Sequence, residues 1–195
     1  MAEVVRPPQF APRPRPPVVP SPVLGTLIFV LAEAMLFAGL ISAHMIVRSS
    51  AITAWPPPGQ PRLPVEETAF NTAALLLSGL LLYLAGVSFE RDPARARRPL
   101  LASILLGAFF VLFQGLEWVA LLGEGLRMTT SQHASFFYLI VGGHALHAIG
   151  GLVVLLRAWL LLGRRRLRAS TLAAVRVFWY FVVGLWPILY LLVYL

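Results

Sequence analysis

The chain contains no cysteine, and only 12% of its 195 residues are charged. The absence of cysteine excludes disulfide bonds and thiolate metal sites, and with them any inference about a redox compartment. Few charges, 58% hydrophobic residues and a mean hydropathy of +0.79 exclude a water-soluble globule, because no soluble core of this size can hold so much apolar surface. The composition therefore indicates an integral membrane protein.

Five long apolar stretches provide the expected membrane spans. A spanning helix needs about 20 mostly apolar residues to cross about 30 Å of hydrocarbon, with its backbone polar groups paired inside the segment. The segments that qualify are Val23–Val47, Thr68–Phe89, Leu100–Leu122, Ala134–Leu162 and Ala174–Leu195. We therefore expect an all-α fold in which residues 23–195 form a membrane bundle of five transmembrane helices. The first segment is too long for a signal-peptide core and is expected to be retained.

Basic residues are distributed unequally between the two ends of these spans. Of the 16 basic residues, 13 lie in or beside the N-terminal segment, the second-to-third connection and the fourth-to-fifth connection. The other three are Arg48, Arg62 and Arg127. Because short basic loops are held in the cytoplasm during insertion, the N-terminus is predicted to be cytoplasmic and the C-terminus to lie outside.

The N-terminal tail and the net charge indicate which kinds of molecule the chain can bind. Residues 1–22 are rich in proline and arginine, cannot bury a core and are expected to be extended or disordered. The net charge of +8 does not indicate a nucleic-acid partner, since the arginines lie at helix ends and not on a basic soluble domain. Phospholipids are the expected partners, with Arg157 and Arg176 as candidate lipid-binding residues.

One acid is expected deep inside the membrane. Glu33 lies about ten residues into the first span, hence roughly 15 Å from its cytoplasmic end. A charge at this depth is unfavourable by several kcal/mol unless it is shielded, paired or neutralised. Glu33 therefore either hydrogen-bonds a neighbouring helix as a structural contact or takes part in proton handling, and the sequence favours neither.

The fourth span carries two histidines, His144 and His147, between pairs of glycines. Their spacing places both imidazoles on neighbouring parts of one helix face. Such a pair can bind a metal or haem, but the chain lacks the repeated Glu-x-x-His pairs of a di-iron bundle. We expect interhelical hydrogen bonding and no metal, with Glu33 as a candidate partner for one of the histidines.

Further polar residues are expected nearer the outer face. Gln114 and Glu117 share one face of the third span at a depth where a charge is less unfavourable. His44 and Arg48, near the outer end of the first span, are expected to be interface anchors and not ligands. The stretch from Trp55 to Glu67 is long enough to form a structured cap on the outside.

Five motifs occur in an order that is typical of one family. They are Leu31-Ala-Glu-Ala-Met-Leu-Phe-Ala-Gly39, Trp55-Pro-Pro-Pro-Gly59, Gln114-Gly-Leu-Glu-Trp118, Ser135-Phe-Phe-Tyr-Leu-Ile-Val-Gly-Gly-His-Ala-Leu-His147 and Phe178-Trp-Tyr-Phe-Val-Val-Gly-Leu-Trp186. Together they resemble subunit III of haem-copper oxidases, the cytochrome c oxidase polypeptide III family, in its shorter five-helix form. The resemblance covers all five spans.

The resemblance implies a non-catalytic subunit of a respiratory terminal oxidase in a bacterial-type inner membrane. Such a subunit stabilises catalytic subunit I, supports its proton uptake and holds lipid, and it has no cofactor because haem and copper lie in partner subunits. The family's buried polar positions fall on Glu33, Gln114, Glu117, His144 and His147.

The fifth span departs from the family pattern. The family has Trp-His-Phe-Val-Asp where this chain has Tyr180 in place of the histidine and Val183 in place of the aspartate, which puts a polar link through this helix in doubt. An accessory protein of nitric oxide reductase with the same fold therefore stays open, as does the donor, cytochrome c or quinol. A small proton-coupled transporter using Glu33 is a third possibility, although no inverted repeat of the kind common in transporters is evident.

Overall fold

The structure is a computed structural model that describes residues 18–51, 55, 57, 61 and 63–194. Its five long helices are α1 (Ser21–Ser49), α2 (Val65–Arg91), α3 (Arg97–Gly123), α4 (Gln132–Gly163) and α5 (Ala169–Leu189). A 3-10 turn, η1 (Pro93–Ala96), precedes α3, and a π-helical turn, η2 (Tyr190–Tyr194), follows α5. All five helices are long and apolar enough to cross a membrane, and no strand occurs in the described ranges. The predicted all-α fold with five spans is confirmed, whereas most of the N-terminal tail lies outside the described residues.

All five helices begin two to five residues before the apolar stretches that predict them, and two of these extensions have a clear local cause. α5 starts at Ala169, five residues before the expected start, and Arg168 provides the carbonyl oxygen for the first helical hydrogen bonds. α2 starts at Val65 and has Glu66 and Glu67 in its first turn, where acids interact favourably with the helix dipole. Each extension includes polar residues, Glu66 and Glu67 in α2 and Ser170 and Thr171 in α5, which a search for apolar runs misses.

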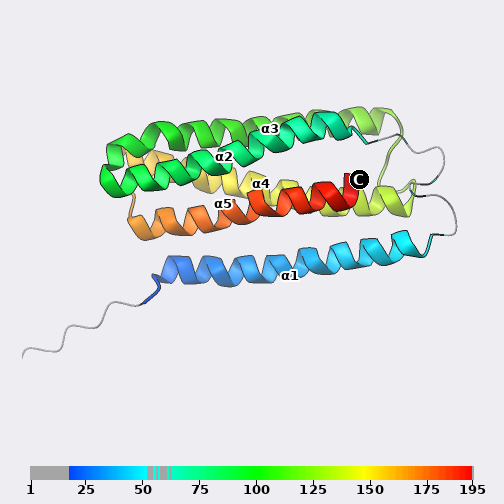
Figure 1. Ribbon diagram of the computed structural model, residues 1–195, viewed down its shortest axis with the longest axis horizontal. Helices are drawn as coiled ribbons and strands as arrows, with labels where there is room; N and C mark the ends of the chain where they lie inside the picture. The colour runs from blue at the N-terminus through cyan, green and yellow to red at the C-terminus, as the bar shows by residue number, and fades with distance from the viewer. Residues whose placement is uncertain (1–17, 52–54, 56, 58–60, 62, 195) are drawn as a thin grey trace, which may run out of the picture.

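The helices lie nearly parallel to one axis (Figure 1). α2 and α3 form the most closely packed pair, α5 contacts α1, α2 and α4, and α1 packs mainly against α5. α1 is also the most exposed helix, with 6% of its most apolar window buried against 33–39% in the other four. The core therefore lies among α2 to α5, and α1 is attached along one side.

The start of α1, the α2–α3 connection and the α4–α5 connection lie at the same end of the bundle (Figure 1). Residues 90–98 and 163–168 at this end contain eight arginines and two acids. We call it the arginine-rich end. Its assignment to the cytoplasm stays a prediction, since the bundle itself does not define the two sides of a membrane.

Two tryptophans connect α5 to α2. The indole N–H of Trp179 donates to Ser78 Oγ at 2.9 Å, and that of Trp186 donates to Thr72 Oγ1 at 2.8 Å. Both indoles are fully buried, so each hydrogen bond also satisfies a donor that water cannot reach. The doubt about a polar link through the fifth span was wrong, because the indoles make this link while Val183 packs against Gly79.

Glycines on two neighbouring helices accommodate the Trp179 ring. A Cβ atom on Gly107 of α3 or on Gly151 of α4 would stand 2.7 Å from a ring carbon of Trp179. Any larger residue at either position must displace a fully buried indole. The glycines therefore set how closely α3, α4 and α5 approach each other.

Candidate functional site

The mid-membrane acid and one histidine of α4 are in direct contact. Glu33 Oε2 lies 3.0 Å from His147 Nε2, and the two side chains are 18% and 14% exposed. His147 Nδ1 lies 2.7 Å from the carbonyl oxygen of Gly143, one turn earlier on α4. The expected pairing of Glu33 with one of the two histidines is confirmed.

These contacts limit how the two side chains can interact. The carbonyl of Gly143 can only accept, so His147 Nδ1 carries a hydrogen and donates it. The contact between Nε2 and Oε2 is not aligned as a regular hydrogen bond, but two lone pairs at 3.0 Å would repel each other. The close approach fits either an ion pair of the two side chains or a neutral acid beside a neutral imidazole. Both arrangements satisfy the requirement that a buried charge be paired or neutralised.

Aromatic rings surround this pair. Phe29 stacks on the His147 ring at 6.4 Å between centroids, Phe37 meets it edge-on at 5.5 Å, and Phe178 lies at 6.3 Å. Phe37 also lies 3.7 Å from where a Cβ on Gly143 would stand, so α1 and α4 are in van der Waals contact at this point. The pair occupies an apolar setting that strengthens its electrostatic attraction.

His144 does not form the interhelical hydrogen bond expected of it. Both of its ring nitrogens lack a hydrogen-bonding partner among the described residues, and the ring packs on Trp186 and Phe110 at centroid distances of 5.0 and 6.2 Å. It lines an apolar cavity of about 190 Å³ that also contacts Gln114. The i, i+3 spacing turns His144 toward α3 and α5, whereas His147 faces α1.

A second polar cluster joins α2, α3 and the C-terminal turn. Gln114 Nε2 donates to Glu117 Oε2 at 2.6 Å and contacts Tyr194 Oη at 3.1 Å, while Thr68 Oγ1 donates to Glu117 Oε2 at 3.1 Å. Gln114 and Glu117 are both buried by their neighbours. The sequence correctly predicted that Gln114 and Glu117 share one helix face. It did not predict the contacts of Thr68 and Tyr194, because both residues lie on other helices and no sequence spacing relates them to α3.

Trp55 packs against the end of α1 that lies opposite the arginine-rich end. Trp55 meets the rings of His44 and His133 at centroid distances of 5.7 and 5.2 Å. His44 is only 1% exposed, so its expected role as an interface anchor was wrong. Its ring nitrogens make no hydrogen bond with described residues, although the carbonyl of Leu192 lies close enough to interact with the ring. The placement of Trp55 agrees with the expected cap.

The two candidate lipid-binding arginines differ in their surroundings. Arg157 is exposed on α4. Arg176 lies across Gly86 of α2, with its Nε 3.4 Å from Tyr180 Oη and its guanidinium carbon 5.9 Å from the centre of that ring. Tyr180, which replaces the family's histidine, thus contacts a cation within α5.

The described residues contain no group of three or more His, Asp or Glu side chains that could hold a metal ion. The polar clusters contain acids, amides and imidazoles held between helices, and no nucleophile is paired with a base as in an acyl-transfer site. The fold and these clusters define a multi-pass helical membrane protein with polar contacts inside its bundle.

Comparison of the sequence with known proteins shows to which family the chain belongs. The family model described as "Cytochrome c oxidase subunit III" matches residues 4–195. The chain is 33% identical over 185 residues to a protein of Nocardia farcinica named "Probable cytochrome c oxidase subunit 3", covering 88% of this chain and 86% of that protein. It is 30% identical over 181 residues to "Cytochrome c oxidase subunit 3" of Thermostichus vulcanus, covering 89% and 86%. The chain belongs to the cytochrome c oxidase subunit III family, and neither nitric oxide reductase nor a transporter is favoured.

Proposed function

We propose that this chain is a non-catalytic subunit of a cytochrome c oxidase in the inner membrane of a bacterial-type cell. It would pack against catalytic subunit I, stabilise that subunit during turnover and support its proton uptake. Haem and copper would lie in the partner subunits. The family supports the assignment to an oxidase, and the names of the relatives support cytochrome c as the electron donor.

The contact between Glu33 and His147 carries the proton-linked part of the proposal. Because the two side chains lie 3.0 Å apart between α1 and α4, a proton taken up by either one would leave no isolated charge in the membrane. The same contact also attaches α1, the least buried helix, to the bundle. Both roles serve a subunit that supports a proton-consuming partner.

Lipid binding is the second part of the proposal. Arg157 is exposed on α4, and Arg176 has no ion pair with a described residue. A phospholipid phosphate supplies the missing negative charge to such arginines near a membrane boundary.

The assignment to an oxidase is tested by purifying the chain from its native membrane. We expect it to be recovered together with haem-bearing catalytic subunits. Recovery as a free oligomer that transports a solute would contradict the proposal and favour the transporter.

The role of Glu33 is tested with two variants. Glu33→Ala should leave assembly largely intact and shorten the life of oxygen-consuming activity several-fold during sustained turnover. Glu33→Gln separates the two roles, because its amide N–H can still donate to His147 Nε2 but cannot release a proton. Loss of activity in Glu33→Gln supports proton handling, whereas normal activity in Glu33→Gln or loss of assembly in Glu33→Ala supports a structural contact. Glu124→Gln, at the exposed end of α3, is the matched control.

A further inference from the structure

The cavity of about 190 Å³ beside His144 lies between α3 and α4 and is bordered by Trp186 of α5. Three of its lining residues, Gln114, Trp118 and His144, carry buried polar atoms that have no hydrogen-bonding partner among the described residues. Gln114 and His144 are only 3% and 1% exposed. Because buried polar atoms are normally paired, three unpaired groups around one cavity indicate a bound ligand.

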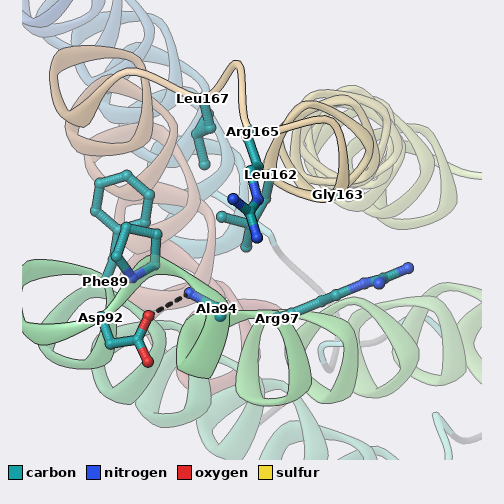
Figure 2. Close-up of a pocket in the computed structure, with 9 residues that line it drawn as sticks. Phe89, Asp92, Ala94, Arg97, Leu162, Gly163, Arg165 and Leu167 are labelled. Atoms are coloured by element: carbon teal, nitrogen blue, oxygen red, sulfur yellow. Dashed lines mark hydrogen bonds between the residues drawn. The ribbon is translucent and has the colours of Figure 1, made fainter.

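A larger pocket, of about 620 Å³, opens at the arginine-rich end (Figure 2) but lacks this feature. Its acid is engaged, since Asp92 Oδ1 accepts the N–H of Ala94 at 2.9 Å (Figure 2). The guanidinium of Arg97 stacks over the ring of Trp159 at 5.0 Å. No buried side-chain polar atom of its described lining is without a partner. The smaller cavity between α3 and α4 therefore has the greater need of a ligand.

The unpaired atoms of the α3–α4 cavity form a defined set of donors and acceptors. The indole N–H of Trp118 can only donate, and Gln114 Oε1 can only accept. A neutral His144 ring has one nitrogen that donates and one that accepts. The set thus contains two donors and two acceptors. Two hydroxyl groups satisfy it, because each hydroxyl both donates and accepts.

The wall of the cavity is suited to a ring. Phe110, Trp118 and Trp186 all contribute aromatic side chains to it, and aromatic rings pack favourably edge-on or offset against one another. An apolar cavity of about 150 Å³ is sufficient to bind benzene and stays dry without it. A cavity of about 190 Å³ therefore accommodates one six-membered ring with small substituents, and its largely apolar wall favours such a ring over water.

Access to the cavity is from the membrane. Gly115 of α3 and Ile149 of α4 belong to its lining and are exposed, and both lie within the apolar lengths of their helices. No atom lies within 4 Å of where a Cβ on Gly115 would stand, so this edge of the cavity is open. A ligand that enters here is dissolved in the hydrocarbon and can leave an apolar tail outside.

We propose that this cavity binds the dihydroxy ring of a membrane quinol, with His144, Trp118 and Gln114 as its hydrogen-bonding partners. The oxidised quinone carries two carbonyl oxygens, which accept but do not donate, so it would leave both acceptors of the site unpaired. The site therefore favours the reduced ligand. The proposed function assigns no ligand to this cavity, and binding requires no electron transfer within the chain.

Binding is tested by titrating the full-length ¹⁵N-labelled chain in detergent with ubiquinol-1, a short-tailed quinol, under argon. The readout is the set of indole N–H signals in the NMR spectrum, assigned with Trp→Phe variants. We expect the signal of Trp118 to move, whereas that of Trp179, which is bonded to Ser78 and lies outside the lining, should stay in place. A Trp118 signal that does not respond to ubiquinol-1 would overturn the proposal.

Two variants locate the ligand. His144→Phe keeps an aromatic ring but removes both nitrogens, so the affinity for ubiquinol-1 should fall about tenfold for the loss of hydrogen bonds. Its thermal midpoint without ligand should be unchanged or higher, because no protein partner is lost. Ala145→Leu fills the cavity and should abolish the response of Trp118. Ala120→Leu, on the exposed surface of α3 outside the lining, is the matched control and should bind as wild type does. Equal affinities of the wild type and His144→Phe would contradict the assigned contacts.

Two further results separate the quinol from other occupants. Ubiquinone-1 should bind more weakly than ubiquinol-1, and equal or tighter binding of the quinone would overturn the preference for the reduced ligand. A lower midpoint of ligand-free His144→Phe, together with no response of Trp118 to ubiquinol-1, would replace the quinol by bound water. The titration uses the chain alone, so its outcome is independent of whether the chain assembles with an oxidase.

Discussion

Gly151→Ala should destabilise the bundle even though alanine normally favours a helix. The new Cβ would stand 2.7 Å from one ring carbon of Trp179 and 2.9 Å from another, well inside the usual contact distance of about 3.5 Å. Trp179 is fully buried and its indole N–H is bonded to Ser78, so the ring cannot swing aside without losing that bond.

The magnitude follows from two opposing effects. Overpacking a core costs about 1–3 kcal/mol, and replacing a helical glycine by alanine contributes up to about 1 kcal/mol in the other direction. We therefore expect a net loss of about 1–2 kcal/mol, observed as a fall of a few degrees in the thermal midpoint of the purified protein in detergent.

The neighbouring Gly150 is the matched control, because a Cβ there meets nothing within 4 Å. Gly150→Ala should leave the thermal midpoint unchanged or raise it slightly. Equal midpoints for the Gly150→Ala and Gly151→Ala proteins would refute the reasoning, since the two changes differ only in whether the methyl group meets Trp179.

Three further outcomes are expected. Trp186→Phe should cost about 2 kcal/mol, because it removes buried ring atoms and the bond to Thr72, and a thermal midpoint equal to wild type would contradict this. His133→Phe should stabilise the protein by about 1 kcal/mol, since both buried ring nitrogens lack a partner among the described residues; a lower midpoint would show that an unseen partner exists. Elemental analysis of the isolated chain should find no stoichiometric iron, copper or zinc, and finding one would overturn the assignment of His144 to packing and of His147 to the contact with Glu33.

The membrane spans could be predicted because a spanning helix depends only on the residues within its own segment. About 20 apolar residues and internally paired backbone groups are sufficient, so the helix positions followed from the sequence with errors of a few residues at helix starts such as Ala169. The pairing of Glu33 with a histidine also followed from a local property, since both residues were expected at similar depth.

Contacts that depend on packing could not be predicted in this way. Which of His144 and His147 faces α1 depends on how α4 is rotated in the bundle, and a 3.6-residue period does not fix that rotation. His44 was predicted to be an interface anchor because the sequence did not show that Trp55 packs against it. Trp55 lies outside the helices, where hydrophobic periodicity does not predict contacts. Tyr194 joins Gln114 only through the π-helical turn after α5.

The position of Glu33 on the first helix has a consequence for biosynthesis. His147 is translated 114 residues after Glu33, a delay of about 6–23 s at 5–20 residues per second. During this interval the nascent chain holds an acid in the bilayer or translocon before its imidazole exists. The newly inserted α1 must therefore carry Glu33 protonated or solvated, and α1 can reach its final place only after the fourth segment has left the ribosome.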